Sequence, residues 1–314
     1  GDPARSPTGR YAAAMLDDAS RTAEVTALIR ASDRRWDPSA RILDDPYAER
    51  FLGPLMKAAL RSWQAGGALS RSLNRVAPLI RNYVLARHRF IDEALGAALA
   101  GDTIEQVVVL GAGYDSRAWR FASALRGRPI FEVDHPATTS RKTHMLARWG
   151  LDLPKTDRRV VALDFEFDEL GDRLAKAGFD PARPAFFIWE GVSMYLTRAA
   201  VKDTLQRLAR LGGPGSELCA DFWFLLDSPD AKATVQRMST GLLHVLGEPV
   251  VFGIHPEDVD HFLQRQGWVT EDVADRTALY DRYVPARDRE LYPAQYVLRA
   301  RRARDASTPL SVVG

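Results

Sequence analysis

The pattern of apolar and polar positions from about residue 104 onward predicts strands and helices in alternation. Short apolar runs of strand length are separated by amphipathic stretches of helical period. Thr197 is the predicted N-cap of the last helix in this series, and the glycine-rich segment 212–215 ends it. Such alternation predicts an α/β fold with a parallel sheet covered by helices on both faces. The predicted strands are Gln106–Gly111, Pro129–Asp134, Arg159–Leu163, Ala185–Glu190 and Ser216–Phe224, and the predicted helices are Arg117–Leu125, Thr138–Trp149, Glu169–Ala177 and Thr197–Leu211.

The end of this series follows a different pattern. After a predicted helix at Pro256–Gln266, the runs Trp268–Val273 and Ala294–Arg299 read as two strands joined by a long loop without a helix. A hairpin there would add an antiparallel strand to a mostly parallel sheet. A dinucleotide-binding Rossmann sheet does not normally contain such a strand, so the order suits a methyltransferase sheet better.

The first hundred residues predict helices only. The segments Ser20–Ser32, Pro46–Trp63 and Pro78–Leu99 have helical patterns, with no strand between them. Because ligands of α/β sheets bind beyond the carboxyl ends of the strands, we expect these helices to cover that open end. We therefore divide the chain into a helical layer or lid at 1–100, a sheet domain at 101–300 and a tail at 301–314.

Composition narrows the class of protein. The net charge of +2 gives little support for nucleic-acid binding, and no apolar run reaches the roughly 18 residues that a membrane span needs. The single cysteine, Cys219, excludes an internal disulfide and is expected to be a packed structural thiol. The six histidines show no zinc-type ligand spacing, so no metal site is expected. The sequence starts without methionine and shows no signal peptide, and we expect a cytoplasmic protein.

The most informative segment is VVVLGAGYDSRAWRF, where a strand passes through a Gly-Ala-Gly turn into a helix. Gly111, Ala112 and Gly113 allow a tight turn and a close approach of ligand to backbone. A dinucleotide fingerprint has its third glycine where this chain has Ser116, and Asp115 would repel a pyrophosphate. The turn therefore favours a nucleoside without phosphates, of which S-adenosylmethionine is the commonest, and Gly111, Ala112, Gly113 and Asp115 are expected to bind it.

Acidic residues follow three successive predicted strands. Asp134 is placed to accept hydrogen bonds from ribose hydroxyls, or else it caps the next turn. Asp164 and Phe165 fit an adenine contact or an ordinary helix start equally well. Glu190 is expected near the amino-acid portion of the cofactor, and Tyr195 either bounds the methyl-transfer channel or packs the helix start.

These segments, in this order, resemble the leucine carboxyl methyltransferase family over residues 20 to 225. Within the family, the closest likeness is to bacterial members associated with polyketide and other natural-product O-methylation. The resemblance implies a class I methyltransferase (Rossmann-like) fold that binds S-adenosyl-L-methionine across the strand ends. The segments that carry it are RTAEVTALIRAS, DDPYAERF, ARHRFID, QVVVLGAGYDSRAWR, FEVDHP, VVALDF, WEGVSMYL and GSELCADF.

The resemblance also implies roles for individual residues. Arg87, rather than Arg81 or Arg89 of the same basic helix, would hold the cofactor carboxylate through its guanidinium fork. Arg21 receives a similar role more weakly. The remaining matches are Gly111 and Gly113 in the turn, Asp134 at the ribose, Asp164 with Phe165 at the adenine, and Glu190 after the fourth strand.

The acceptor is expected to be a small apolar or aromatic molecule that is methylated on oxygen. A carboxylate acceptor is already ionised and needs no base, whereas a phenol with a pKa of about 10 would gain from one. His244 and His255 are the candidates for such a base, although each reads more readily as a surface or packing histidine. The aromatic segment Phe222 to Phe252 is expected to line part of the acceptor site.

Other functions stay open at this stage. Carboxyl methylation of a protein C-terminus is the alternative within the same class. A nicotinamide-dependent oxidoreductase would use the same strand, turn and helix. This chain, however, lacks the third glycine of the dinucleotide fingerprint. A nucleic-acid methyltransferase would need a basic groove, and a binding module without activity would still hold the cofactor. The sequence does not indicate an oligomeric state.

Overall fold

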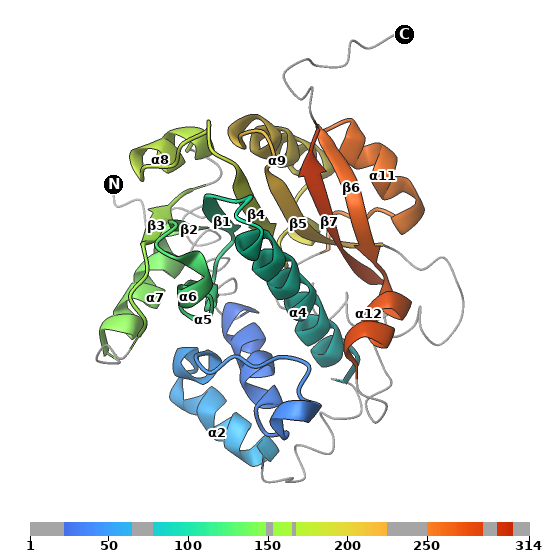
Figure 1. The fold of residues 1–314 in the computed structure, drawn as a ribbon. Helices are drawn as coiled ribbons and strands as arrows, with labels where there is room; N and C mark the ends of the chain where they lie inside the picture. The colour runs from blue at the N-terminus through green and yellow to red at the C-terminus, as the bar shows by residue number, and fades with distance from the viewer. Residues whose placement is uncertain are drawn as a thin grey trace, which may run out of the picture.

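The computed structural model describes residues 22–64, 78–148, 153–164, 168–224, 250–284 and 294–303. A seven-stranded sheet with the order β3-β2-β1-β4-β5-β7-β6 forms its centre (Figure 1). The first five strands are parallel, and β7 is antiparallel to both β5 and β6. The predicted α/β class with an antiparallel C-terminal pair is therefore confirmed. The strands are β1 (Gln106–Leu110), β2 (Ile130–Asp134), β3 (Arg158–Ala162), β4 (Ala185–Trp189), β5 (Glu217–Trp223), β6 (Trp268–Ala274) and β7 (Gln295–Arg302).

Side-chain alternation along the strands separates two apolar cores. Val107 and Val109 of β1 belong to one core, and Val108 and Leu110 belong to the other. Because both faces of the central strands are covered by helices, these strands read as continuous apolar runs rather than as alternating ones. The first core includes residues of α4 (Pro78–Ala100), α6 (Ala122–Leu125), α7 (Pro136–Arg148) and α12 (Arg276–Tyr283), and the second includes residues of α8 (Leu170–Lys176), α9 (Arg198–Leu211) and α11 (Pro256–Gln264).

The connection between the last two strands differs from the prediction. Instead of a loop alone, helix α12 lies between β6 and β7. The carboxylate of Asp275 accepts a hydrogen bond from the N–H of Ala278 at 2.9 Å and caps this helix. The helix was missed because RTALYDRY has few apolar residues at helical spacing, whereas the cap itself was legible in the sequence.

Two predicted helices are each divided in the structure. The segment 46–63 contains the short 3-10 helix η3 (Ala48–Phe51) and then α2 (Pro54–Gln64), separated at Leu52 and Gly53. The segment after the glycine turn contains α5 (Arg117–Arg120) and α6, separated at Phe121. Proline at position 54 has no N–H for a continuing helix, and this accounts for the first division. In contrast, Thr197 caps α9 as predicted, because its side chain accepts the N–H of Ala200.

The N-terminal helices lie beside the carboxyl ends of the parallel strands (Figure 1). Residues 22–33 are helical, and together with η3 and α2 they share the first core with α4 through Ala27, Phe51 and Leu60. The proposed boundary at residue 100 stays a prediction. Within the described ranges, none of the helices combines the length and the apolar character that a membrane crossing requires.

Removal of one core side chain gives a test of the second core. Phe187 is fully buried in β4, and its ring meets Trp268 edge-on, with centroids 6.2 Å apart. Phe187→Ala is expected to lower the free energy of unfolding by about 3–5 kcal/mol, measured by urea denaturation. Leu55→Ala is the control, because Leu55 is 79% exposed and its loss should change stability by about 0.5 kcal/mol or less. Equal losses in the two variants would contradict the described packing.

Candidate functional site

The glycine turn after β1 requires two residues in the left-handed region. Gly111 has a φ of +64° and Gly113 a φ of +43°. A Cβ at position 111 would lie 2.5 Å from Cγ2 of Val192, so the turn also packs against the segment that follows β4. The N–H of Ala112 donates to the carbonyl of Val133 at 3.1 Å and ties the turn to β2. The backbone therefore lies close to the carboxyl ends of three strands.

A cavity of about 380 Å³ opens at these strand ends, and we refer to it as the strand-edge cavity. Its walls come from the glycine turn, the ends of β2 and β4, helix α4 and the helical residues 22–33. The structure therefore brings most of the predicted site residues together. Those that line the cavity are Arg87, Gly111, Ala112, Gly113, Asp115, Asp134, Glu190 and Tyr195.

Asp134 is held at the cavity wall by backbone donors. Its Oδ2 accepts the N–H of Gly113 at 2.5 Å, and its Oδ1 accepts the N–H of His135 at 2.6 Å. Burial raises the pKa of Asp134, although both backbone donors act in the opposite direction. Each carboxylate oxygen keeps a second lone pair, so the group can still accept hydrogen bonds from a ligand.

Arg87 is fixed on two sides and keeps one nitrogen without a partner. Its Nε donates to Glu190 at 3.0 Å, and its Nη1 donates to Asp221 at 2.8 Å. No described group accepts a hydrogen bond from Nη2. A Cβ at Gly191 would lie 3.4 Å from this Nη2, and Gly191 has a φ of +71°. Glycine at this position therefore keeps the guanidinium accessible from the cavity.

Arg117 lies at the centre of a group of buried charged side chains next to the strand-edge cavity. It is completely buried and donates to Asp92 at 2.7 Å, to Glu190 at 2.9 Å and to Asp115. Burial alone would raise the pKa of Glu190, but His88, Arg117 and Arg87 hold it well below the ordinary value. Glu190 is therefore a stable carboxylate at neutral pH.

His88 is surrounded by charged neighbours. Its Nδ1 lies 3.0 Å from Glu190, which requires a donor, and its Nε2 lies 2.7 Å from a nitrogen of Arg120, which requires an acceptor. Nη2 of Arg117 also lies 2.9 Å from Nδ1, so the same ring nitrogen faces both a carboxylate and a guanidinium. Burial and the positive charge of Arg117 lower the pKa of His88, so the ring is neutral at neutral pH.

Asp115 has its carboxylate turned toward the protein. The carboxylate accepts the backbone N–H of Arg117 at 2.6 Å as well as its side chain. The backbone N–H of Arg117, at the start of α5, is therefore bonded within the protein. The Asp115 carboxylate takes the place that a ligand anion would occupy at this helix start.

One group of possible metal ligands forms in the described part of the chain. His88, Asp115 and Glu190 have ligand atoms within 4.8 Å of one another. The guanidinium of Arg117 donates to both carboxylates and contacts His88 at 2.9 Å. The cation that these groups share is therefore an arginine side chain, and the group offers little room for a metal ion.

Two important residues were missed in the sequence. Arg30 lines the strand-edge cavity from the helical residues 22–33; its Nη2 donates to the carbonyl of Tyr114 at 2.6 Å, and its buried Nε has no partner. Asp221 of β5 holds Arg87 and accepts the N–H of Gly191 at 2.6 Å. Both lie in segments that carry the family resemblance, so the signal was present, but nothing in the spacing distinguished these residues.

Other predicted residues lie elsewhere. Asp164 does not line the cavity, although it is 3.8 Å from His135, which does. His255 is the residue before α11 and packs 5.2 Å from the ring of Phe224, away from the cavity lining. The predicted site residues Arg21, Phe165 and His244 lie outside the described residues.

The predicted aromatic lining is corrected in part. Phe222 and Phe252 are buried in the second core, where their rings meet with centroids 6.2 Å apart. Neither of them lines the strand-edge cavity. Residues 225–249 of the same predicted lining are not described. The alternation of strand residues between two faces places Phe222 on the side of α9 and α11.

The chain is similar in sequence to proteins from two Mycolicibacterium species. A protein of Mycolicibacterium smegmatis, which carries the provisional name S-adenosyl-L-methionine-dependent methyltransferase, is 32% identical over 292 residues, which cover 85% of this chain and 90% of that protein. A relative from Mycolicibacterium paratuberculosis with the same provisional name is 31% identical over 83% of this chain and 86% of its own length.

Solved structures share the fold at low sequence identity. A protein from Streptomyces avermitilis described as a DUF574 family protein has a TM-score of 0.55 at 14% identity, covering 87% of this chain and 96% of its own. A Thermobifida fusca protein, provisionally described as a methyltransferase, has a TM-score of 0.54 at 15% identity, covering 87% and 97%.

The family model with the description leucine carboxyl methyltransferase matches residues 23–209. This range includes the glycine turn, Asp134, Arg87 and Glu190, and it extends through α9. It also includes Arg30, which the structure adds to the cavity wall. The chain belongs to the leucine carboxyl methyltransferase family.

Proposed function

We propose that this protein is an S-adenosyl-L-methionine-dependent O-methyltransferase that acts on a small, polyketide-like molecule with a carboxylate or hydroxyl group. The observation that carries the proposal is the meeting of the glycine turn, Asp134 and Arg87 in one cavity at the carboxyl ends of parallel strands. The glycine turn suits a nucleoside without phosphates, Asp134 suits the ribose hydroxyls of that nucleoside, and Arg87 suits an amino-acid carboxylate. A cavity of about 380 Å³ is in the range of small-ligand sites.

The nucleoside half is assigned to the β1 and β2 side of the cavity. Asp134 accepts hydrogen bonds from the ribose hydroxyls, through the carboxylate lone pairs that the N–H groups of Gly113 and His135 do not use. Gly111 and Gly113 let the nucleoside lie against the backbone without a side chain between them. Asp164 lies next to His135 at the adenine end, and Phe165 is proposed to stack on the base.

The amino-acid half is assigned to the arginine side of the cavity. Nη2 of Arg87 has no acceptor among the described residues and can bind the methionine carboxylate, while Arg30 adds positive charge to the same cavity wall. Glu190 lies beside them as a permanent carboxylate and attracts the α-amino group. Arg21 is proposed to add positive charge near the same carboxylate.

The described groups favour an acceptor that needs no base. Methyl transfer from a sulfonium is a direct displacement, and alignment of the reacting atoms can supply roughly 7–11 kcal/mol. His88 is neutral, but both of its ring nitrogens are occupied by Glu190 and Arg120, so it does not serve as a base. Tyr195 is proposed to border the reacting methyl group. A carboxylate acceptor is therefore placed ahead of a hydroxyl, for which His244 is the candidate base that remains, since His255 lies away from the cavity lining.

Binding measurements distinguish the methyl donor from a dinucleotide. We expect calorimetry to show one site for S-adenosylhomocysteine and none for NAD. Asp134→Ala should weaken S-adenosylhomocysteine by about 10–100-fold, since hydrogen bonds to a charged group contribute about 1.5–3 kcal/mol. Asp102→Ala is the control, because it removes an exposed carboxylate that does not line the cavity. Binding of NAD alone would overturn the proposed function in favour of an oxidoreductase.

The glycine turn gives a second test with a matched control. Gly111→Ala places a Cβ against Val192 and should abolish most S-adenosylhomocysteine binding, in addition to the cost of about 1–2 kcal/mol for a positive φ. Gly127→Ala bears the same strain, since Gly127 has a φ of +82°, but its Cβ would meet open space. The Gly127→Ala variant should bind S-adenosylhomocysteine with the same affinity as the unmodified protein. Equal loss of affinity in both variants would place the turn outside the binding site.

The pH dependence of turnover distinguishes the two acceptor chemistries. With a carboxylate acceptor, the rate should stay flat from about pH 6 to 9, because the acceptor is ionised throughout this range. With a hydroxyl acceptor and a histidine base, the rate should fall steeply below about pH 7 as the base is protonated. Initial rates with matched acid and phenol acceptors measure this difference. A flat profile with turnover of acids alone would support the carboxylate, and the steep profile would contradict it.

A further inference from the structure

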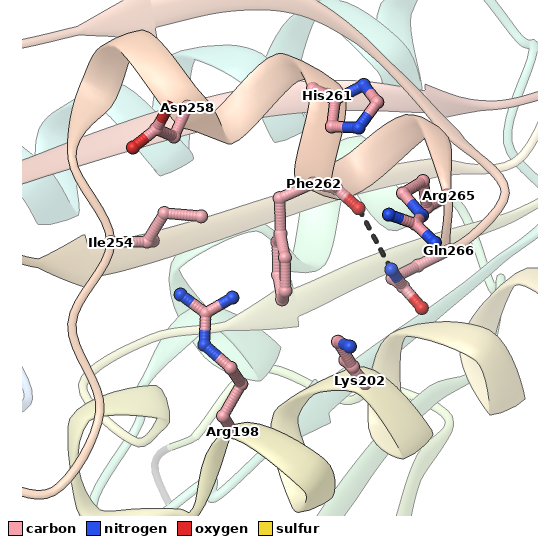
Figure 2. Close-up of a pocket in the computed structure, with 8 residues that line it drawn as sticks. All are labelled: Arg198, Lys202, Ile254, Asp258, His261, Phe262, Arg265 and Gln266. Atoms are coloured by element: carbon pink, nitrogen blue, oxygen red, sulfur yellow. Dashed lines mark hydrogen bonds between the residues drawn. The ribbon is translucent and has the colours of Figure 1, made fainter.

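A second hollow of about 250 Å³ lies between helices α9 and α11, on the opposite face of the sheet from α4 (Figure 2). We refer to it as the α9–α11 hollow. Its apolar floor includes Ile254 and Phe262, both of which are buried. None of the residues that line it also lines the strand-edge cavity. The hollow is therefore not part of the proposed methyl-donor site.

The rim of this hollow gathers positive charge from both helices. Arg198 and Lys202 are one turn apart on α9, and Arg265 is the C-cap residue of α11. Like charges at this spacing weaken a helix rather than stabilise it. Asp258 is the one carboxylate among the lining residues. The three permanent cations thus exceed the anionic charge of the rim by two.

These cations lack the carboxylate partners that other surface arginines of the protein have. Within the described ranges, no ion pair forms at Arg198, Lys202 or Arg265. By contrast, Arg207, further along α9, pairs with both Asp203 and Glu169. The charges at the hollow are therefore available to an anion from solution.

Arg198 is also held in place over the floor of the hollow. Its guanidinium carbon lies 5.5 Å from the ring centroids of both Phe252 and Phe262, within the range of cation–π contact. Figure 2 shows the side chain rising from α9 toward Ile254 and Phe262. A guanidinium that is already positioned loses less entropy when it binds an anion.

We propose that the α9–α11 hollow binds an organic phosphate. A phosphate group carries a charge of about −1.5 to −2 at neutral pH, which matches the excess positive charge of the rim. Arg198 and Arg265 offer planar guanidinium forks for phosphate oxygens, and Lys202 offers a third cation. Ile254 and Phe262 provide an apolar surface for the carbon skeleton of the ligand. A concave site with charges of one sign concentrates such anions.

Calorimetry with phenyl phosphate tests this site in protein saturated with S-adenosylhomocysteine, at constant ionic strength. Saturation keeps phosphate out of the strand-edge cavity, where Arg30 and Arg87 could also bind it. We expect one saturable site and tighter binding of phenyl phosphate than of inorganic phosphate, because the floor contributes to affinity. Arg198→Ala and Arg265→Ala should each weaken binding by about tenfold, as expected for charge-assisted hydrogen bonds.

Arg210→Ala is the matched control. It removes the same charge from the same helix, at an exposed position outside the hollow, and should leave the phenyl phosphate affinity unchanged. If Arg210→Ala weakened phenyl phosphate binding equally, the loss of affinity would follow from the net charge of the protein, and the proposal would be overturned. Absence of saturable binding would overturn it as well. If S-adenosylhomocysteine fails to bind while phenyl phosphate still depends on Arg198 and Arg265, only the proposed function is contradicted.

Discussion

The fully buried guanidinium of Arg117 is the interaction on which the rest of the site depends. It joins Asp92 of α4, Asp115 of the glycine turn and Glu190 at the end of β4. Each of these carboxylates leaves water at a cost of several kcal/mol, which only the opposite charge and good hydrogen bonds offset. Removal of one partner would leave a buried charge without compensation. The three elements are therefore fixed relative to one another by one side chain.

Further ion pairs extend from Arg117 to two other arginines, Arg87 and Arg120. Glu190 and Asp221 hold Arg87 from α4, while Asp92 and Asp45 surround Arg120. Asp45 also accepts from Ser116 at 2.7 Å and lies 3.4 Å from Arg30. The N-terminal helical residues and the sheet thus meet through hydrogen-bonded charges as well as through the apolar core. This is why the N-terminal helices supply cavity walls rather than a loose cover.

The fold was largely predictable, because its strands carry their signal locally. A buried parallel strand such as β1 is a short β-branched run, and Asp134 follows β2 at a distance that the strand–turn–helix unit dictates. The network around Arg117 was not predictable, since some of the residues that meet there are more than 100 positions apart in sequence and any of them could have been a surface ion pair. Asp221 and Arg30 were missed for the same reason. Helix α12 was missed because its sequence has a weak apolar pattern, and the clearest signal of the helix is the cap residue Asp275.

The sign of the network favours a cationic cofactor. Five carboxylates are linked to four guanidiniums, and His88 adds no charge while its pKa stays low (the members are Asp45, Asp92, Asp115, Glu190, Asp221, Arg30, Arg87, Arg117 and Arg120). Lys142 donates to the carbonyl of Asp115 at 2.8 Å and shares Glu132 with Arg158, which adds one positive charge, so the negative charge that remains is that of Asp134. S-adenosylmethionine carries a sulfonium, an ammonium and a carboxylate, and its net charge is positive. A dinucleotide brings a negatively charged pyrophosphate instead, and the Asp115 carboxylate already occupies the helix start that would receive it. Electrostatics and turn geometry therefore both favour S-adenosylmethionine over a dinucleotide.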